Sequence, residues 1–535
     1  MGPGDGRGGP ADDRAGLNGA ARGSRHAALV AAGIFVSRIF GLVRQRVLAH
    51  YLGLSGASDA FAAAFRIPNF LQNLLGEGVL SASFIPVYAR LRAERHDEDA
   101  RRLASAVLAM LALVTSLVVL AGVWLAGPLT DLIAGGFTGE KRALTVRLVR
   151  ILFPGAGLLV LSAWCLGVLN SHRRFFLSYA APVVWNLAII LTVMLSAGRH
   201  DEAGAALAAA VGSVIGSALQ FAIQLPTVLG LLHGLRLRLD EGAADTRTVL
   251  RNFGPVFVSR GVVQISAFID TILASFLGDG PVAALGMAQV LYTLPVSLFG
   301  MSVSAAELPE MSRATGSDQT VAATLRDRLD GGLRRIAFFV VPSAAAFLAF
   351  GGVIAAAVFQ TGRFTALDSR YVWTILAGSA VGLLAATMGR LYNSAYYALR
   401  DTKTPLRFAL IRVVLTVGLG YLCAIPLPPA LGLDARWGAV GLTASAGIAG
   451  WVEFTLLRRG LNRRVGPSGL PLSYQARLWV AALVGVAVGL AIAYGTGSVA
   501  PIPRALLVLT PFGLAYLGVG LALGTPEARA LIGRR

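Results

Sequence analysis

The chain has 535 residues, of which 55% are apolar and 14% are charged, and its formal net charge is +19. Its mean hydropathy is +0.67. Soluble domains carry about 25% charged residues, so the composition excludes an ordinary soluble enzyme and a disordered chain. It indicates a polytopic membrane protein, whose cytoplasmic loops account for the basic balance without a nucleic-acid partner.

The N-terminal segment 1–25 is rich in Gly, Ala and Arg and has no apolar core. This predicts a disordered cytoplasmic tail without a cleavable signal. Fourteen apolar stretches follow, each about long enough to cross a bilayer as a helix. The predicted helices cover residues 27–52, 57–93, 102–126, 143–170, 175–197, 203–230, 248–277, 281–312, 334–358, 371–398, 405–425, 437–457, 475–495 and 503–523.

The loops between these helices alternate in basic charge. With the N-terminus inside, the inside segments hold 32 Lys and Arg residues and the outside segments hold 7. Basic residues favour the cytoplasmic side, so both termini are predicted to be cytoplasmic. Two segments, 128–142 and 324–336, are interpreted either as short amphipathic pieces at the membrane surface or as ordinary loops.

The chain repeats itself at an offset of about 223 residues, where Asn170 recurs as Asn393 and Pro182 recurs as Pro405. Six helices separate the copies, and an even number gives both copies the same orientation. Parallel repeats of this kind occur in secondary transporters. The fold class is therefore all-α, with two six-helix lobes in parallel repeat and two additional C-terminal helices. The predicted parts are a tail at 1–25, an N-terminal lobe at 26–232, a C-terminal lobe at 247–458, the additional helices at 474–524 and a tail at 525–535.

Charged residues concentrate in the first, second and seventh predicted helices, although each costs about 2.5–3.5 kcal/mol at a helix centre. They are Arg38, Arg44, Arg46, Asp59, Arg66, Glu77, Arg260 and Asp270. Asp59, Arg66 and Glu77 fall within about 40° of one another on a helical projection. We interpret this pattern as a water-filled cavity between the lobes with an excess of positive charge. Such a cavity suits an anion, and the forked guanidinium of Arg suits a phosphate.

A structural interpretation remains open for each of these charges. Each Arg could pair with an acid and lock two helices together, and Arg46 and Arg390 could reach the membrane surface. Asp270 is a candidate ligand for a coupling monovalent cation, or a partner for Arg260. The sequence shows no ATP-binding domain, metal-ligand spacing or cofactor motif. Transport would therefore draw on an ion gradient or on the membrane potential.

Two adjoining motifs carry a family resemblance. They are SRIFGLVRQRVLAHYLG at 37–53 and SDAFAAAFRIPNFLQNLLGEGVLSASFIPVYA at 58–89. Together with later loops they resemble the MurJ/MviN family over roughly residues 27–525. The resemblance implies a fourteen-helix flippase of the multidrug/oligosaccharidyl-lipid/polysaccharide exporter superfamily, not an enzyme.

Several functional expectations follow from the resemblance. Family members move lipid II, an undecaprenyl-pyrophosphate-linked disaccharide-pentapeptide, from the inner to the outer leaflet of the bacterial plasma membrane for peptidoglycan synthesis. Expected partners are therefore lipid II, membrane lipids and the cell-wall synthesis machinery. Helices 13 and 14 are expected to hold a groove for the lipid tail.

Site residues carry over by position. Arg38 and Arg44 match two essential cavity arginines of the family, and Asp59 matches a functional acid at the start of the second helix. Arg66 stands where a Lys is common, and Glu77 matches the acid of an EG pair.

The chain also departs from the family pattern. Gln72 stands where the family often has an Arg, and the charged positions of helix 8 are occupied here by Gln289, Val290 and Thr293. The cavity is therefore expected to be less basic on that side. We hypothesise that Arg260, in an otherwise apolar span, supplies the missing cation.

Three other functions stay open. The first is a flippase for another polyprenyl-linked glycan, or a drug exporter of the same superfamily. The second is a membrane enzyme acting on a lipid-linked sugar, although the outside loops offer no acid/base cluster beyond His200, Asp201 and Glu202. The third is a scaffold of the wall-synthesis machinery, which should tolerate replacement of Arg38.

Overall fold

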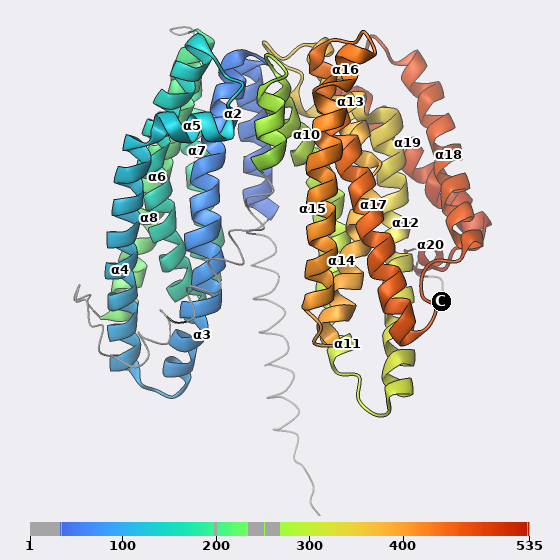
Figure 1. Ribbon diagram of the computed structural model, residues 1–535, viewed down its shortest axis with the longest axis horizontal. Coiled ribbons are helices and arrows are strands. Elements are labelled where there is room, and N and C mark those ends of the chain that lie inside the picture. The colour runs from blue at the N-terminus through green and yellow to red at the C-terminus, as the bar shows by residue number, and fades with distance from the viewer. Residues whose placement is uncertain are drawn as a thin grey trace, which may run out of the picture. The chain divides into compact units, whose positions relative to one another are not determined.

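The computed structural model describes residues 33, 35–196, 201–233, 251, 268–531 and 533. These residues are helical apart from short turns and one isolated bridge between Thr361 and Phe364. The chain divides into two compact units, each shown as a bundle of helices in Figure 1. Unit 1 comprises 1–48, 64–129 and 144–265, and unit 2 comprises 49–63, 130–143 and 266–535.

Unit 1 contains long apolar helices that follow a first helical segment at 35–52. They are α2 Gly56–Leu71, the π-helical η1 Gln72–Gly78, α3 Val79–Ala93, α4 Asp97–Trp124, α6 Gly139–Ser171, α7 Phe175–Ser196 and α8 Glu202–Leu232. The first residues of α2 and α6, and the end of the 35–52 segment, belong to unit 2. Local signals set the ends of these helices: α4 has three acids in its first turn, and Asp201 caps α8 by accepting from the Gly204 amide at 2.9 Å.

Unit 2 contains the remaining elements. They are α10 Pro281–Pro295, the π-helical η2 Val296–Met301, α11 Ser302–Ser312, α12 Asp318–Phe359, α13 Ala366–Ala380, α14 Leu383–Ala398, α15 Lys403–Ala424, α16 Leu427–Ala430, η3 Ala435–Trp437, α17 Gly438–Val465, α18 Leu472–Gly495, α19 Pro501–Ala522 and α20 Pro526–Leu531. The short α5 Ala126–Ile133 spans the boundary between the units.

Most predicted spans coincide with observed helices. Ten helices of the described chain are long and apolar enough to cross a membrane, and α13 with α14, bent by 42°, gives an eleventh. The first and seventh predicted spans lie partly outside the described residues, and the second is divided by η1. The chain is thus an all-helical, multi-pass membrane protein.

The two predicted surface segments turn out differently. Residues 324–336 are not a separate surface piece, because α12 runs without a break from Asp318 to Phe359. Ser317 starts this long helix by accepting from the Thr320 amide. The other segment, 128–142, contains the end of α5 and the start of α6.

The internal repeat is visible in the backbone. The π-helical turns η1 and η2 begin at Gln72 and Val296, 224 residues apart, each inside the second helix of its copy. The turns after α6 and α14 also match, because Arg173 and Arg400 both adopt φ 58°. Single π-turns inside α-helices often mark functional positions. Their repetition therefore indicates that α2–α3 and α10–α11 are candidate functional helices.

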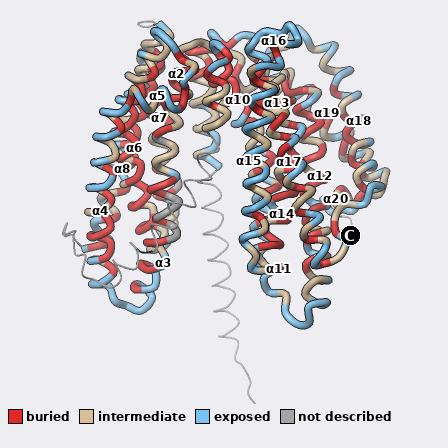
Figure 2. The backbone as a smooth tube through the Cα atoms, in the orientation of Figure 1, coloured by how far each residue is buried: buried red, intermediate tan, exposed pale blue. Residues whose placement is uncertain are grey.

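Each unit has its own apolar core, in which the buried residues of Figure 2 line the inner faces of the helices. In unit 1 the core surrounds Trp164 of α6, together with Phe84 and Tyr88 of α3. In unit 2 the helices α18 and α19 pack against α12, where Tyr516 donates to the Phe338 carbonyl at 2.6 Å. The additional C-terminal helices are therefore an integral part of unit 2.

Candidate functional site

Arg44 occupies an aromatic site in unit 1. Its guanidinium carbon lies 5.3 Å from the ring centre of Phe65, on α2, and 5.0 Å from that of Trp185, on α7. The two rings are stacked at 5.6 Å, and the Trp185 indole N–H donates to the Ser213 carbonyl at 3.1 Å. Three helices of unit 1 therefore fix the surroundings of this cation.

The aromatic site leaves the charge of Arg44 uncompensated. Within the described chain, no carboxylate forms an ion pair with Arg44, and its buried Nε has no hydrogen-bond partner. Aromatic faces attract a guanidinium through their quadrupole without neutralising it. The site can therefore offer a positive charge to an anion.

The other charged residues predicted for the site have different surroundings. Arg38 lies on the same helix and is exposed, with no ion pair to another described residue, whereas Arg66 on α2 is half-buried. Glu77 lies within the π-helical turn η1. Asp270 is half-buried in a helical segment at 268–275, and Arg260 lies outside the described residues.

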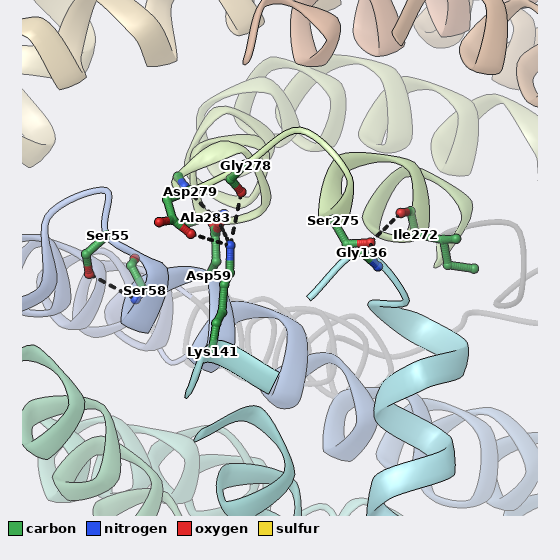
Figure 3. A network of polar contacts seen from close by, with 11 residues as sticks. Ser55, Ser58, Asp59, Gly136, Lys141, Ile272, Ser275, Gly278, Asp279 and Ala283 are labelled. Atoms are coloured by element: carbon green, nitrogen blue, oxygen red, sulfur yellow. Dashed lines mark hydrogen bonds and ion pairs between the residues drawn. The ribbon is translucent and has the colours of Figure 1, made fainter. Parts of the chain in front are cut away.

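Asp59 has no exposed surface and joins three helix ends within unit 2. Lys141, on α6, donates to its Oδ2 at 2.8 Å, and the amides of Gly280 and Ala283 donate to its two oxygens at 2.8 Å (Figure 3). These amides are at the N-terminus of α10, where a carboxylate is favoured by the unpaired N–H groups and the helix dipole. The carboxylate of Asp59 is thus fully occupied by protein donors.

Further contacts surround this ion pair. Lys141 also donates to Asp279 at 2.8 Å and to the Gly278 carbonyl at 3.0 Å, and its ammonium lies 4.1 Å from the ring centre of Phe137. Nearby, the Gly136 amide donates to Ser275 at 2.9 Å (Figure 3). A Cβ at Gly136 would lie 2.4 Å from the Ser275 backbone, so only glycine permits this approach.

The sequence analysis assigns no role to Lys141, which pairs with Asp59, or to Glu453, which forms a separate ion pair. Glu453, on α17, accepts from Arg412, on α15, at 3.1 Å. Arg412 lies within the predicted span 405–425 and Glu453 within 437–457, and opposite charges in two successive spans are the signal that could have found this pair.

Helix α10 contains no charged residue. Gln289 is exposed and donates to Thr293 at 3.2 Å, while the Thr293 hydroxyl donates back to the Gln289 carbonyl at 2.7 Å. Both side chains therefore remain polar but neutral.

An apolar cavity of about 240 Å³ lies within unit 2, between α18 and the helices α12, α13, α14 and α17. Its apolar walls include Val341, Leu384, Trp451, Leu478 and Trp479. The polar side chains of Arg458 and Gln475 also line it. Among the described residues, no group of three His, Cys, Asp or Glu side chains is placed to hold a metal ion.

Comparison with known proteins places this arrangement in a family. The family model described as lipid II flippase MurJ matches residues 48–508. The lipid II flippase MurJ of Burkholderia cenocepacia is 32% identical over 461 residues, which cover 84% of this chain and 86% of that protein. The chain belongs to the lipid II flippase MurJ family. A probable lipid II flippase MurJ of Haemophilus influenzae is 30% identical over 442 residues, covering 80% of this chain and 84% of the relative.

Solved structures support the fold. A lipid II flippase MurJ in an inward closed conformation superposes with a TM-score of 0.76 at 24% identity, covering 94% of this chain and 100% of that chain. A MATE family multidrug transporter of the MOP superfamily superposes with a TM-score of 0.65 at 17% identity, covering 80% of this chain and 95% of that one. At these identities the likeness shows a shared transporter fold.

Proposed function

We propose that this MurJ family member moves lipid II from the inner to the outer leaflet of the bacterial plasma membrane by alternating access. Both termini then lie in the cytoplasm, and the protein carries out no covalent chemistry on the lipid. The observation that carries the proposal is the Arg44 site, where stacked rings hold a guanidinium without a counter-charge. A diphosphate headgroup supplies the missing anion.

Under this proposal, the predicted site residues have different roles in binding the lipid. Arg38, Arg44 and Arg66 bind the diphosphate, and Arg260 adds the cation that α10 does not provide. Glu77 stays a candidate substrate-binding residue because of its position in the sequence motif. Asp59 acts through its bonds to Lys141 and the N-terminus of α10, so its part is to hold these helix ends together.

The apolar cavity beside α18 is suited to the lipid tail. Its walls come mainly from aliphatic and aromatic side chains, and Arg458 also lines it. Burying apolar chain surface there contributes about 25 cal/mol per Å². The two additional helices α18 and α19 are proposed to hold the polyprenyl chain, and the lining of this cavity supports that proposal for α18.

The driving force is proposed to be the membrane potential, because a charge moved across 100 mV changes the free energy by about 2.3 kcal/mol. Asp270 is a candidate ligand for a coupling monovalent cation. Cell-wall synthesis proteins are expected to be neighbours of the protein at the membrane.

The test is complementation in a bacterium depleted of its own flippase. Cells carrying this chain should grow, and lipid II should become accessible on the outer leaflet. Arg44→Ala should abolish both, whereas Arg46→Gln, two residues further along the same helix, should preserve both. Growth and outer-leaflet lipid II at wild-type levels with Arg44→Ala would overturn the proposal and favour a scaffold.

A second candidate is a flippase for another polyprenyl-linked glycan, which the neutral pair Gln289 and Thr293 on α10 favours. It predicts that a different lipid-linked glycan, and not lipid II, accumulates on the outer leaflet of the complemented cells.

A further inference from the structure

Trp185 attaches the Arg44 site to helix α8. Its indole N–H donates to the Ser213 carbonyl at 3.1 Å and lies 3.3 Å from the Ser213 hydroxyl oxygen. Ser213 is 3% exposed, so water does not compete for these acceptors. The indole is therefore fixed by a buried hydrogen bond between α7 and α8, two helices that pack along each other (Figure 1).

A glycine lets α8 approach the indole closely. A Cβ at Gly216, three residues after Ser213, would lie 2.8 Å from Cδ1 and 2.8 Å from the backbone carbonyl oxygen of Trp185. Any larger residue would therefore push the indole or the helix away. Phe65 stacks on the indole, with ring centres 5.6 Å apart and ring planes at 16°. The indole is thus held at its edge by α8 and at its face by Phe65.

Arg44 depends on these two rings for its position. Its guanidinium carbon lies 5.0 Å from the ring centre of Trp185 and 5.3 Å from that of Phe65. Within the described residues, its buried Nε has no hydrogen-bond partner. A long side chain that becomes ordered only when a ligand binds weakens the affinity. Rings that order the guanidinium beforehand remove this penalty.

The internal repeat offers a comparison for Trp185. Phe408 lies three residues after Pro405, as Trp185 does after Pro182. Phe408 faces α17 much as Trp185 faces α8, because a Cβ at Gly460 would lie 3.5 Å from its Cε2 atom. Phenylalanine has no N–H to donate. The anchoring hydrogen bond is therefore a feature of the copy that holds Arg44.

We propose that Trp185 is a positioning residue for the substrate. Fixed to α8 and stacked on Phe65, it holds the Arg44 guanidinium in one orientation and leaves the N–H donors of Arg44 to a diphosphate. The identity of this ligand, a lipid diphosphate, rests on the proposed function. Trp185 has no donor left for a phosphate, because its single N–H is bonded to Ser213. Its substitution should therefore affect binding only while Arg44 is present.

The test is lipid binding by the purified full-length protein in nanodiscs, with lipid II and undecaprenyl diphosphate as probes. Trp185→Leu should weaken binding of both lipids about five- to tenfold, because Arg44 must then be ordered at the moment of binding. Trp185→Phe keeps an aromatic face for the cation and should bind both lipids within about threefold of wild type. Equal losses in the Leu and Phe variants would contradict the role of the ring.

A double-mutant cycle shows whether Trp185 acts through Arg44. Arg44→Met should weaken binding of both lipids at least about tenfold, because charge-assisted hydrogen bonds are lost. Adding Trp185→Leu should change the remaining binding by less than about twofold, because no guanidinium is left to position. A further five- to tenfold loss in the double variant would overturn the proposal, since Trp185 would then act independently of Arg44.

Trp373 is the matched control for the loss of an indole. It lies on α13 in unit 2, and its N–H donates to the Phe347 carbonyl at 3.1 Å, the same distance as at Trp185. Trp373→Leu removes the same ring and the same kind of hydrogen bond, so it should lower thermal stability about as much as Trp185→Leu. Its binding of both lipids should stay within about twofold of wild type. A five- to tenfold loss of binding would show that the assay reports helix packing, which would overturn the proposal.

The outcomes also distinguish this inference from the proposed function. Lipid II binding in the wild type, with additive effects of the Arg44 and Trp185 substitutions, contradicts the inference alone. Binding of undecaprenyl diphosphate but not lipid II, with non-additive effects, contradicts the proposed substrate alone. Wild-type protein that binds neither lipid contradicts both.

Discussion

Units 1 and 2 stabilise buried charges in different ways. In unit 1, Arg44 lies over the rings of Phe65 and Trp185 and has no carboxylate partner among the described residues. In unit 2, Asp59 is paired with Lys141, and Arg412 is paired with Glu453. The first arrangement preserves a charge and the second cancels it.

The difference separates charges that hold the protein together from charges that bind a ligand. Removing one member of a buried ion pair leaves the other unpaired in a poor solvent, which costs stability. Removing a cation from an aromatic site leaves no opposite charge behind. Substitutions in the ion pairs of unit 2 should therefore lower mainly the free energy of unfolding. Substitutions at the Arg44 site of unit 1 should lower mainly transport.

The largest effect on stability is expected at Asp59. Asp59→Asn should lower the free energy of unfolding by about 3 kcal/mol, because Lys141 and two amides of α10 lose a buried charged acceptor. Asp279→Asn is the matched control, since Asp279 accepts from the same Lys141 but its side chain is 69% exposed. Its cost should stay below about 1 kcal/mol. Unfolding of the purified protein by a denaturing detergent measures both, and equal losses would contradict the distinction.

A smaller effect on stability is expected at Arg44. Arg44→Met loses a cation–π contribution of about 1–2 kcal/mol but no longer buries a charge. The net change in the free energy of unfolding should be below about 1 kcal/mol, while outer-leaflet lipid II in complemented cells falls to background. The same detergent titration and the complementation assay provide the two readouts. A loss of about 3 kcal/mol or more would show that Arg44 is as structural as Asp59.

The turns after α6 and α14 are repeat counterparts and are expected to differ in their pH response. After α6, His172 bonds to the Tyr88 hydroxyl at 2.9 Å, and burial, followed by the charge of Arg92, lowers the pKa of His172. After α14, hydrogen bonds from Thr404 and the charge of Arg464 lower the pKa of Asp401 to about 2.

The pH windows follow from these directions. The unfolded His takes up a proton below about pH 6.5 while the folded His172 stays neutral, so its contribution is lost as pH falls below that value. The Asp401 contribution is complete above about pH 4 and is lost as pH falls towards 2. His172→Gln should flatten the stability profile below about pH 6.5, and Asp401→Asn should flatten it only below about pH 4. A profile of His172→Gln that keeps the wild-type slope would contradict the assignment.

The sequence predicts the fold largely because long apolar stretches, basic loops and a repeat each constrain it independently. It also draws attention to Arg44, which with Arg38 and Arg46 is one of three Arg residues in the first apolar span. The sequence does not predict the contact partners of these charges. Lys141 lies 82 residues from Asp59, and no periodicity connects them. The rings around Arg44 come from two other helices, and aromatic residues are too common in apolar spans to be assigned in advance.

The smallest effect is expected where the two units agree. Arg173 and Arg400 both end a helix at φ 58°, and their following amides bond back to Leu169 and Tyr396 at 2.9 and 3.0 Å. A side chain costs about 1 kcal/mol in this left-handed conformation, so Arg173→Gly and Arg400→Gly should each raise the free energy of unfolding by up to about 1 kcal/mol. Ala at either position keeps the Cβ and should give no gain.

If the proposed orientation holds, these two turns are cytoplasmic, where positive charge helps to set the orientation of the spans. Glycine should therefore stabilise the folded protein while weakening its topological signal, which reporter fusions to the following loop can measure. Equal gains at both turns would show that the repeat preserves backbone geometry even where the units differ in how they hold charge. A gain at only one turn would extend the difference between the units from their charges to their backbones.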